Sequence, residues 1–219
     1  TAGQWERGVP QSTAAQPGED HTPDPGVNCW ITGAAAGAGV GTFDVDNGTT
    51  TLRSPVLDLS SATDATRIGY WRWYSNTAGA APNADVFVVG ISADGGTNWT
   101  DVEVVGPTGE GTSGGWFYHE FRVTDFVPLT DSVRMRFVAS DLGSGSIVEA
   151  AIDDVTIFAV SCDDTCAADF DGNGTVEVPD IFAFLAAWFA QQPAADFDGV
   201  GGVAVPDIFA FLSAWFGGC

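Results

Sequence analysis

A 24-residue segment occurs twice near the end of this chain. The first copy begins at Ala167 and reads AADFDGNGTVEVPDIFAFLAAWFA. The second begins at Ala194, 27 residues later, and 19 of its 24 positions are identical. In both copies an acidic, glycine-rich stretch runs directly into an uncharged stretch rich in phenylalanine, leucine and tryptophan. The repeat therefore predicts two copies of one local structure, a loop followed by an apolar helix, packed against each other.

Oxygen-bearing residues recur at alternate positions of the first copy. If Asp169 is position 1 of a twelve-residue loop, Gly174 is position 6, and positions 1, 3, 5, 7, 9 and 12 are Asp169, Asp171, Asn173, Thr175, Glu177 and Asp180. This is the spacing of an EF-hand-type calcium loop. Calcium takes six to eight oxygens, and alternate residues of a tight loop converge on it only where a glycine permits the sharp turn. We expect a Ca²⁺ site here; a metal-free acidic turn is the alternative.

The repeat pair, residues 166 to 219, resembles the dockerin repeat, in which each of two calcium loops is followed by one helix and closed by an aspartate. Asp180 and Asp207 match that aspartate, and Val176 and Val203 match the apolar position 8. The resemblance implies that Thr175 binds through its carbonyl and Glu177 directly or through water. It implies side-chain ligation by Asp169, Asp171, Asn173 and Asp180.

The second loop departs from the family pattern. Position 5 is Val200, position 9 is Ala204, and position 7 is Gly202, which offers only a carbonyl. Three side-chain ligands remain, namely Asp196, Asp198 and Asp207, so we expect a weaker site completed by waters and carbonyls. Both copies also have Val-Pro where cohesin-binding dockerins carry polar residues, and neither helix contains a lysine or arginine. Cohesin binding therefore does not follow from the resemblance.

The composition limits the partners and the number of domains. With seven arginines, no lysine and 29 acidic residues, the net charge is −22, which attracts divalent cations and disfavours nucleic-acid binding. The longest uncharged apolar stretch, 181 to 190, is about half the roughly 20 residues of a membrane helix, so we expect no membrane span. We expect a large domain over residues 1–161 and a small one over 162–219. Because the chain opens at Thr1 without a signal sequence, we interpret it as a processed product.

Four cysteines are present, an even number. Cys166 and Cys219 bracket the repeat pair, where a disulfide would join the ends of a small module. Cys29 could then pair with Cys162. Three connectivities are open, and a thiolate metal site is the rival interpretation. Disulfides would place the protein in an oxidising, extracellular location.

The first 160 residues have the pattern of a β-sandwich or barrel. Short runs rich in valine, isoleucine and aromatic residues recur between glycine, aspartate and asparagine clusters. We expect strands at 49–59, 67–74, 85–92, 116–124, 132–140 and 147–160. Tryptophans 71, 73, 99 and 116 are expected in the core rather than on a sugar-binding surface.

Several phrases of this region, such as Trp5-Glu6-Arg7-Gly8 and Ile152-Asp153-Asp154-Val155, resemble the MAM-like jelly-roll domains appended to secreted bacterial peptidases. The resemblance implies a mainly β fold, a non-catalytic jelly-roll β-sandwich followed by a small α-helical dockerin-like domain with two EF-hand-type loops. It also implies a structural cation, for which Asp44, Asp46 and Asp153 are the candidate ligands, with Glu6 as a further one. The segment 92–99 resembles the Asp-box hairpin, which is a structural turn.

No catalytic set is evident in the sequence. His21 and His119 occur in different contexts, without a metalloprotease motif or a nucleophile elbow. We therefore predict a non-catalytic, extracellular calcium-binding structural or interaction protein, a self-assembling subunit of a bacterial surface filament or layer. Each helix is apolar nearly all round, so beyond the stripe it buries against the other helix it needs a second surface, either the sandwich itself or a neighbouring molecule. Association would use these helices or an extended N-terminal segment added to an edge of the sandwich. The alternative is a carbohydrate-binding or docking module of a larger secreted hydrolase, with a glycan as partner.

Overall fold

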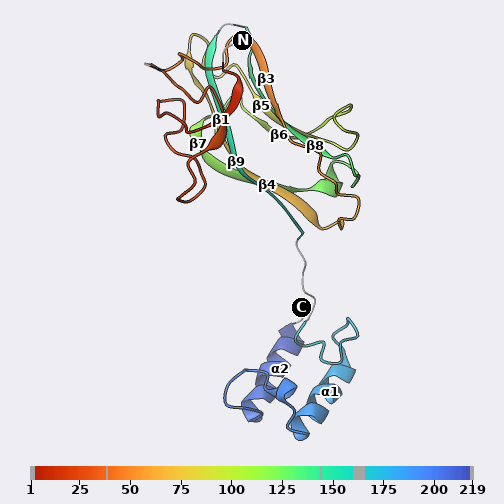
Figure 1. Ribbon diagram of the computed structural model, residues 1–219. Helices are drawn as coiled ribbons and strands as arrows, with labels where there is room; N and C mark the ends of the chain where they lie inside the picture. The colour runs from red at the N-terminus through yellow and green to blue at the C-terminus, as the bar shows by residue number, and fades with distance from the viewer. Residues whose placement is uncertain (1–2, 38, 144, 160–165, 218–219) are drawn as a thin grey trace. The chain divides into compact units, whose positions relative to one another are not determined.

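The computed structural model describes residues 3–37, 39–143, 145–159 and 166–217 (Figure 1). The chain forms two compact units, Thr1–Val160 and Ser161–Cys219. The boundary expected between residues 161 and 162 falls outside the described residues. The first unit is built of strands and the second of helices, so the fold is mainly β, as predicted.

Two antiparallel sheets make up the first unit. The five-stranded sheet has the order β1-β2-β9-β4-β7, and the four-stranded sheet has the order β3-β8-β5-β6. The strands are β1 (Trp5–Gly8), β2 (Cys29–Thr32), β3 (Gly48–Arg53), β4 (Thr66–Gly79), β5 (Phe87–Ser92), β6 (Thr100–Val105), β7 (Ser113–Arg122), β8 (Arg134–Asp141) and β9 (Ser146–Ala159), with a 3₁₀ turn η1 (Val123–Asp125). Both sheets contribute to one apolar core between them, which agrees with the predicted sandwich.

Side-chain alternation assigns the two faces of β4. Ile68, Tyr70 and Tyr74 are buried in the core, so Trp71 and Trp73 point to the outer face. Trp73 and Trp116 are opposite each other on β4 and β7, and Trp99 lies on the other sheet beneath the Arg136 guanidinium at 4.8 Å. The expectation that these tryptophans are core residues holds in part: none of them belongs to the core between the sheets, but all four are partly buried. Trp73 and Trp116 pack against a second, smaller buried cluster.

A bulge in β9 changes which residues face inward. The register against β4 shifts between Gly69 and Trp71, and Asp154 has a φ of 46°. One extra residue is accommodated there, so Ile152 before the bulge and Val155 after it lie on the same inner face. The two aspartates of the bulge, Asp153 and Asp154, are thereby presented together to the loop at residues 21 and 22.

The second unit contains two helices, α1 (Val178–Phe189) and α2 (Val205–Gly217), and a 3₁₀ turn η2 (Pro193–Ala195). Phe184 and Phe211 occupy equivalent positions in the two repeats and stack in the core, with ring centroids 4.2 Å apart and planes 3° from parallel. Phe170 and Phe197, also equivalent, contact this pair edge-on. The sequence duplication therefore becomes a pseudo-symmetric aromatic core.

The cysteines differ in part from the expectation. Cys29 is a buried free thiol rather than half of a disulfide with Cys162. Burial, and then the charges of Asp153 and Asp20, raise the pKa of this thiol to about 12. Cys162 and Cys219 lie outside the described residues, so the pairing of Cys166 with Cys219 stays a prediction.

Candidate functional site

The first repeat gathers three carboxylates. Oxygens of Asp169, Asp171 and Asp180 lie within 4.8 Å of one another. Asp180 is buried, and its two oxygens accept the backbone N–H groups of Asp171 (3.0 Å) and Glu177 (2.8 Å). These bonds, from Glu177 first and then from Asp171, lower the pKa of Asp180, so this carboxylate is held ionised and in place.

The second repeat forms an equivalent triad of carboxylates in a loop that has fewer side-chain oxygens. Oxygens of Asp196, Asp198 and Asp207 again lie within 4.8 Å of one another, and Asp207 accepts the N–H groups of Asp198 (3.0 Å) and Ala204 (2.7 Å). Oδ1 of Asp196 is buried without a hydrogen-bond partner. Val200 at loop position 5 is 73% exposed and contributes no side-chain oxygen. An orphaned carboxylate oxygen inside an oxygen cluster fits a hard cation such as Ca²⁺.

The remaining predicted ligands of the first loop lie around its triad without belonging to the carboxylate group. Asn173 Oδ1 accepts the backbone N–H of Thr175 at 2.9 Å, and the Asn173 N–H donates to Asp169. Glu177 stands at the N-cap of α1, outside the cluster of three. Gly202 has a φ of 82°, a conformation that favours glycine at loop position 7.

Each loop is bonded to the helix of the other repeat. Trp188 of α1 donates its indole N–H to the carbonyl of Ala204 at 2.8 Å, and Trp215 of α2 donates to the carbonyl of Glu177 at 3.1 Å. Ala204 and Glu177 are both position 9 of their loops. Apart from the repetition of the tryptophans, no sequence signal indicates this pair of bonds. The two acidic loops are thus coupled through reciprocal contacts.

The helices leave four large aromatic side chains in solvent. Phe182, Phe189, Phe209 and Phe216 are between 67% and 78% exposed, and they are two equivalent pairs of the repeat. Four phenylalanines exposed to this degree are uncommon on an unpartnered module of this size. The second unit is the tail of the chain, residues 166–217 as described. The expectation that each of its helices is apolar beyond the stripe buried against the other helix is confirmed there.

The structure does not bring Asp153 together with Asp44 and Asp46. Among the described residues, the two aspartate triads are the carboxylate groups close enough to share an ion. Asp44 lies near Asp46 and Asp141, where burial and these charges raise its pKa, and near Glu149, whose pKa is raised by burial and by the charge of Asp44. Asp153 is four residues beyond Glu149 on β9, roughly 13 Å along an extended strand. Glu6, the fourth candidate, accepts the N–H of Ala34 at 2.7 Å.

Glu149 is a buried acid that sequence analysis missed. Its carboxylate accepts one hydrogen bond, from the Thr32 hydroxyl at 2.8 Å. Burial, together with the charge of Asp44, raises the pKa of Glu149 to about 8. Burial and the charge of Asp46 likewise raise the pKa of Asp44 to about 6. Nothing in the run Val148-Glu149-Ala150 distinguishes this acid from a solvated one.

Asp153 and Asp154 hold the N-terminal loop against the outer face of the five-stranded sheet. Asp153 accepts the His21 N–H at 2.9 Å, and Asp154 contacts the His21 ring nitrogen Nδ1 at 2.9 Å. The His21 ring stacks on Trp71 with centroids 3.7 Å apart. Burial opposes ionisation of Asp154, but the bonds from His21 and Thr22 lower its pKa overall. These aspartates therefore serve as loop anchors.

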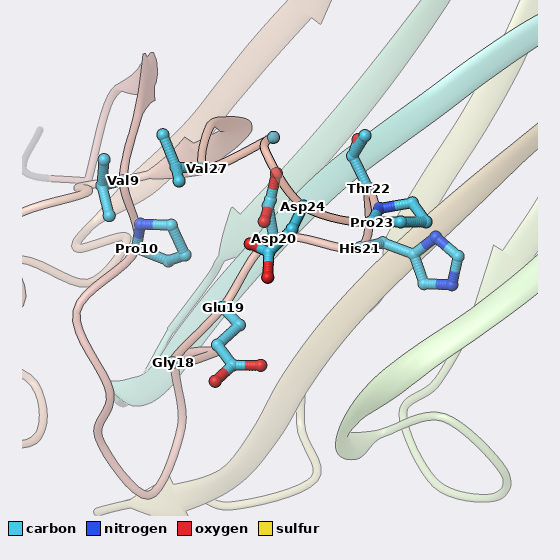
Figure 2. A pocket seen from close by; sticks show the side chains of 11 residues that line it. Val9, Pro10, Gly18, Glu19, Asp20, His21, Thr22, Pro23, Asp24 and Val27 are labelled. Carbon is cyan, nitrogen blue, oxygen red and sulfur yellow. The ribbon is translucent and has the colours of Figure 1, made fainter.

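Two neighbouring cavities lie in this loop region. One, of about 390 Å³, is lined by the loop itself, and Figure 2 shows Asp20 and Asp24 within it while His21 points away toward the sheet. Burial and the charges of Asp153, Asp154 and Asp24 raise the pKa of Asp20. The second, of about 440 Å³, is lined by Trp73 and Trp116 together with Glu19 and Asp20. Partly buried aromatic rings thus line this cavity beside hydrogen-bond acceptors.

The predicted turn at Asp94 is confirmed, and His119 lies beside a carboxylate. Asp94 accepts the N–H groups of Thr97 and Asn98, both at 2.9 Å, as in the predicted hairpin. These bonds, that from Asn98 first, hold its pKa far below the ordinary value. His119 lies 3.5 Å from Glu103, which also accepts from the buried Arg72 at 2.8 Å. Both groups are engaged in holding strands together.

Comparison with known proteins gives no family. No family model matches the chain, and no curated protein matches it. Solved structures to which this chain is similar include the K1 cleaved adhesin domain of Lys-gingipain from Porphyromonas gingivalis W83 (18% identity, 72% of this chain and 91% of that chain, TM-score 0.41), a cyclase from Fischerella sp. TAU (15%, 70% and 73%, 0.34) and a family 16 carbohydrate-binding module (12%, 70% and 89%, 0.33). Their differing names and low TM-scores support no inference about function. No described helix is long and apolar enough to cross a membrane.

Proposed function

We propose that this chain is a non-catalytic, extracellular interaction protein whose C-terminal module is folded by Ca²⁺ and binds other protein, including further copies of itself. Asp169, Asp171 and Asp180 would hold one ion, with Asn173, Thr175 and Glu177 completing the shell. Asp196, Asp198 and Asp207 would hold a second ion with the Gly202 carbonyl and water. Because the first loop has more side-chain oxygens than the second, the first site would bind Ca²⁺ more tightly.

The observation that carries this proposal is the repeated pairing of an aspartate triad with exposed phenylalanines. Three carboxylates within 4.8 Å repel one another unless a cation joins them, so the folded loop binds Ca²⁺ and the unfolded loop does not. The bound ions order the loops, and the loops fix the starts of α1 and α2. The phenylalanine surface is therefore available only in the calcium-loaded state.

Calcium titration and removal test the first half of the proposal. Calorimetric titration of the full chain should show two Ca²⁺ per chain, the second weaker. A chelator should abolish the unfolding transition of the tail and the helical circular dichroism, while the sandwich still melts cooperatively. Asp58→Asn, which removes an exposed sandwich carboxylate, should leave the number of bound ions and the tail transition unchanged. A tail transition that is equally heat-resistant with chelator would contradict the proposal.

Sedimentation of the calcium-loaded protein tests the second half. Mass should rise with concentration, and Phe182→Ser combined with Phe209→Ser should reduce that rise because both copies of one exposed position are lost. Electron microscopy in millimolar calcium should show assemblies. Dispersed monomers at every concentration would contradict self-association, and only binding to a different protein would then stand.

A second candidate function is glycan binding by the sandwich, favoured by the 440 Å³ cavity lined by Trp73 and Trp116. Aromatic faces stack on sugar rings, and the carboxylates of Glu19 and Asp20 can accept hydroxyl hydrogens. The same carboxylates would repel acidic sugars, so the ligand would be a neutral oligosaccharide. This role would make the chain an accessory module of a larger secreted hydrolase.

Titration with cellohexaose, xylohexaose and mannohexaose, and with hexagalacturonate as the acidic comparison, would test this role. Binding of a neutral oligosaccharide should be lost in Trp116→Ala and kept in Trp99→Ala, which changes a tryptophan on the other sheet. Absence of binding by every neutral oligosaccharide would exclude it.

A further inference from the structure

The last five residues of β9, a strand of 14 residues, have no neighbouring strand on one side. β9 is paired with β4 along most of its length, but β2 pairs with it only through Trp30 and Ile31, opposite Ile152 and Ala151. Beyond the bulge, residues 155–159 have β4 on one side and no strand on the other. In the part of the chain that the structure describes, no other backbone group bonds to this free side. It is a bare strand edge.

The sequence of this bare edge differs from that of every terminal strand. β1, β3, β6 and β7 are the outer strands of the two sheets, and each carries at least one charged residue: Glu6 and Arg7, Arg53, Asp101 and Glu103, and Glu120 and Arg122. Charges of this kind protect edges from pairing with other chains. Residues 155–159 read Val-Thr-Ile-Phe-Ala, with high β propensity and no charge or proline.

An apolar cavity opens beside the same edge. It measures about 270 Å³ and lies between the sheets, with Met135, Phe137 and Ile152 among its buried residues. Trp30, Val155 and Ile157 line it and are 41% to 47% exposed although they face the interior. The inner face of the five-stranded sheet is therefore left uncovered where the edge is bare.

We propose that two copies of this chain associate by pairing their β9 edges, residue 157 of one against residue 157 of the other, in antiparallel register. Such a pair is self-complementary, because Val155 and Ile157 of each copy lie on the inner face beside those of its partner copy and cover both cavities. The strand addition supplies main-chain partners, and the apolar residues fix the register. This interface rests on the self-association in the proposed function and adds a second surface to that of the tail.

Charge restricts which surfaces of two copies can meet. Two copies that each carry a net charge of −22 repel, so they can approach closely only through an uncharged surface. Residues 155–159 provide one, and no carboxylate lines the cavity. Two distinct self-interfaces, one on the tail and one on the sandwich, would extend an assembly beyond a dimer. Because salt screens the repulsion, the pairing should strengthen as ionic strength rises.

Sedimentation of the full chain and of its Ile157→Lys variant, both in calcium, tests whether this edge mediates association. The mass of the dimer should be reached at lower concentration in 0.5 M than in 0.05 M salt, and Ile157→Lys should raise the dissociation constant at least about tenfold. Val104→Lys is the matched control, since it adds the same charge to the exposed edge strand β6. Hydrogen exchange should show protection of residues 155–159 that increases with protein concentration.

The possible outcomes separate this interface from the tail. Association that is lost in Phe182→Ser with Phe209→Ser but unchanged in Ile157→Lys would overturn the edge interface while keeping the proposed function. Protection of residues 155–159 in a monomer at the lowest concentration would show that the chain covers its own edge, and would overturn it also. Should Ile157→Lys fail to fold, Ile157→Thr keeps the branched shape and should weaken the pair in the same direction.

Discussion

The tail and the sandwich both bury carboxylates, and they hold them in opposite states. Asp180 in the tail and Glu149 in the sandwich are each almost inaccessible to solvent. Asp180 accepts two backbone N–H groups of its own loop, and its pKa is lowered. Glu149 accepts one hydroxyl, and burial raises its pKa to about 8. The number of donors, rather than burial, decides whether a buried acid here is an anion ready for a cation.

Replacing the closing aspartates should produce the largest effect. In Asp180→Ala combined with Asp207→Ala, four backbone N–H groups lose their acceptors and each triad loses a carboxylate. We expect the tail to lose its cooperative unfolding transition even in millimolar calcium, measured by calorimetry and by circular dichroism. The sandwich transition should persist. A tail that still melts cooperatively would show that the aromatic core alone holds it.

Substitution in the aromatic core of the tail should have the next largest effect. Phe184→Ala removes a buried ring that stacks on Phe211, and large-to-small changes of this kind cost about 3–5 kcal/mol. Phe182→Ala, two residues earlier and exposed, should change stability by no more than about 0.5 kcal/mol. Urea unfolding of the calcium-loaded protein measures both. Equal effects would mean that Phe182 is covered in solution.

The tail could be predicted from sequence because its structure is local. The three aspartates of the triad, the glycine turn and the start of the helix lie within a dozen residues, and the second copy repeats them. The prediction of ligands at Asp169, Asp171 and Asp180 needed only their spacing. The exposed phenylalanines also follow from the absence of a polar face. What spacing could not supply was the exchange of Trp188 and Trp215 between the repeats, which depends on how the helices pack.

The sandwich could be predicted as a class but not as a set of contacts. Runs rich in valine, isoleucine and aromatic residues indicated β3, β4, β5, β7, β8 and β9, whereas β1, β2 and β6 were missed because they are short or interrupted by charged residues. No local pattern predicts the bulge at Asp153 and Asp154, nor that Asp153 lies four strand residues beyond the Glu149 that neighbours Asp44. The free edge after the bulge likewise depends on where β2 stops. Such features arise from pairing between distant segments.

Glu149 makes the contrast testable by pH. Because its folded pKa is about 8 and its ordinary value is 4.5, the folded state binds the extra proton between these values. Its contribution to stability is complete below pH 4.5 and is lost as pH rises through 8. The sandwich should therefore lose a few kcal/mol over this window, with Asp44 adding in the same direction up to about pH 6.

Glu149→Gln should flatten this slope in the midpoint of urea unfolding measured from pH 5 to 8. Thr32→Val should steepen it, because the Thr32 hydroxyl is the bond that lowers the pKa of Glu149. A slope that is unchanged in Glu149→Gln would assign the pH dependence to another group.

The smallest expected effect tests whether the two loops act together. Trp188→Phe keeps an aromatic ring but removes the N–H that bonds the Ala204 carbonyl of the second loop. The bond is exposed, so stability should fall by about 0.5–1 kcal/mol. Calcium affinity should fall at the second site, which α1 supports, and Trp215→Phe should weaken the first site instead. Calcium titration of both variants shows whether each helix supports the loop of the other repeat. Loss of affinity only in the repeat that carries the substitution would show that each loop depends on its own helix. The tail would then differ from the sandwich in being held by purely local structure.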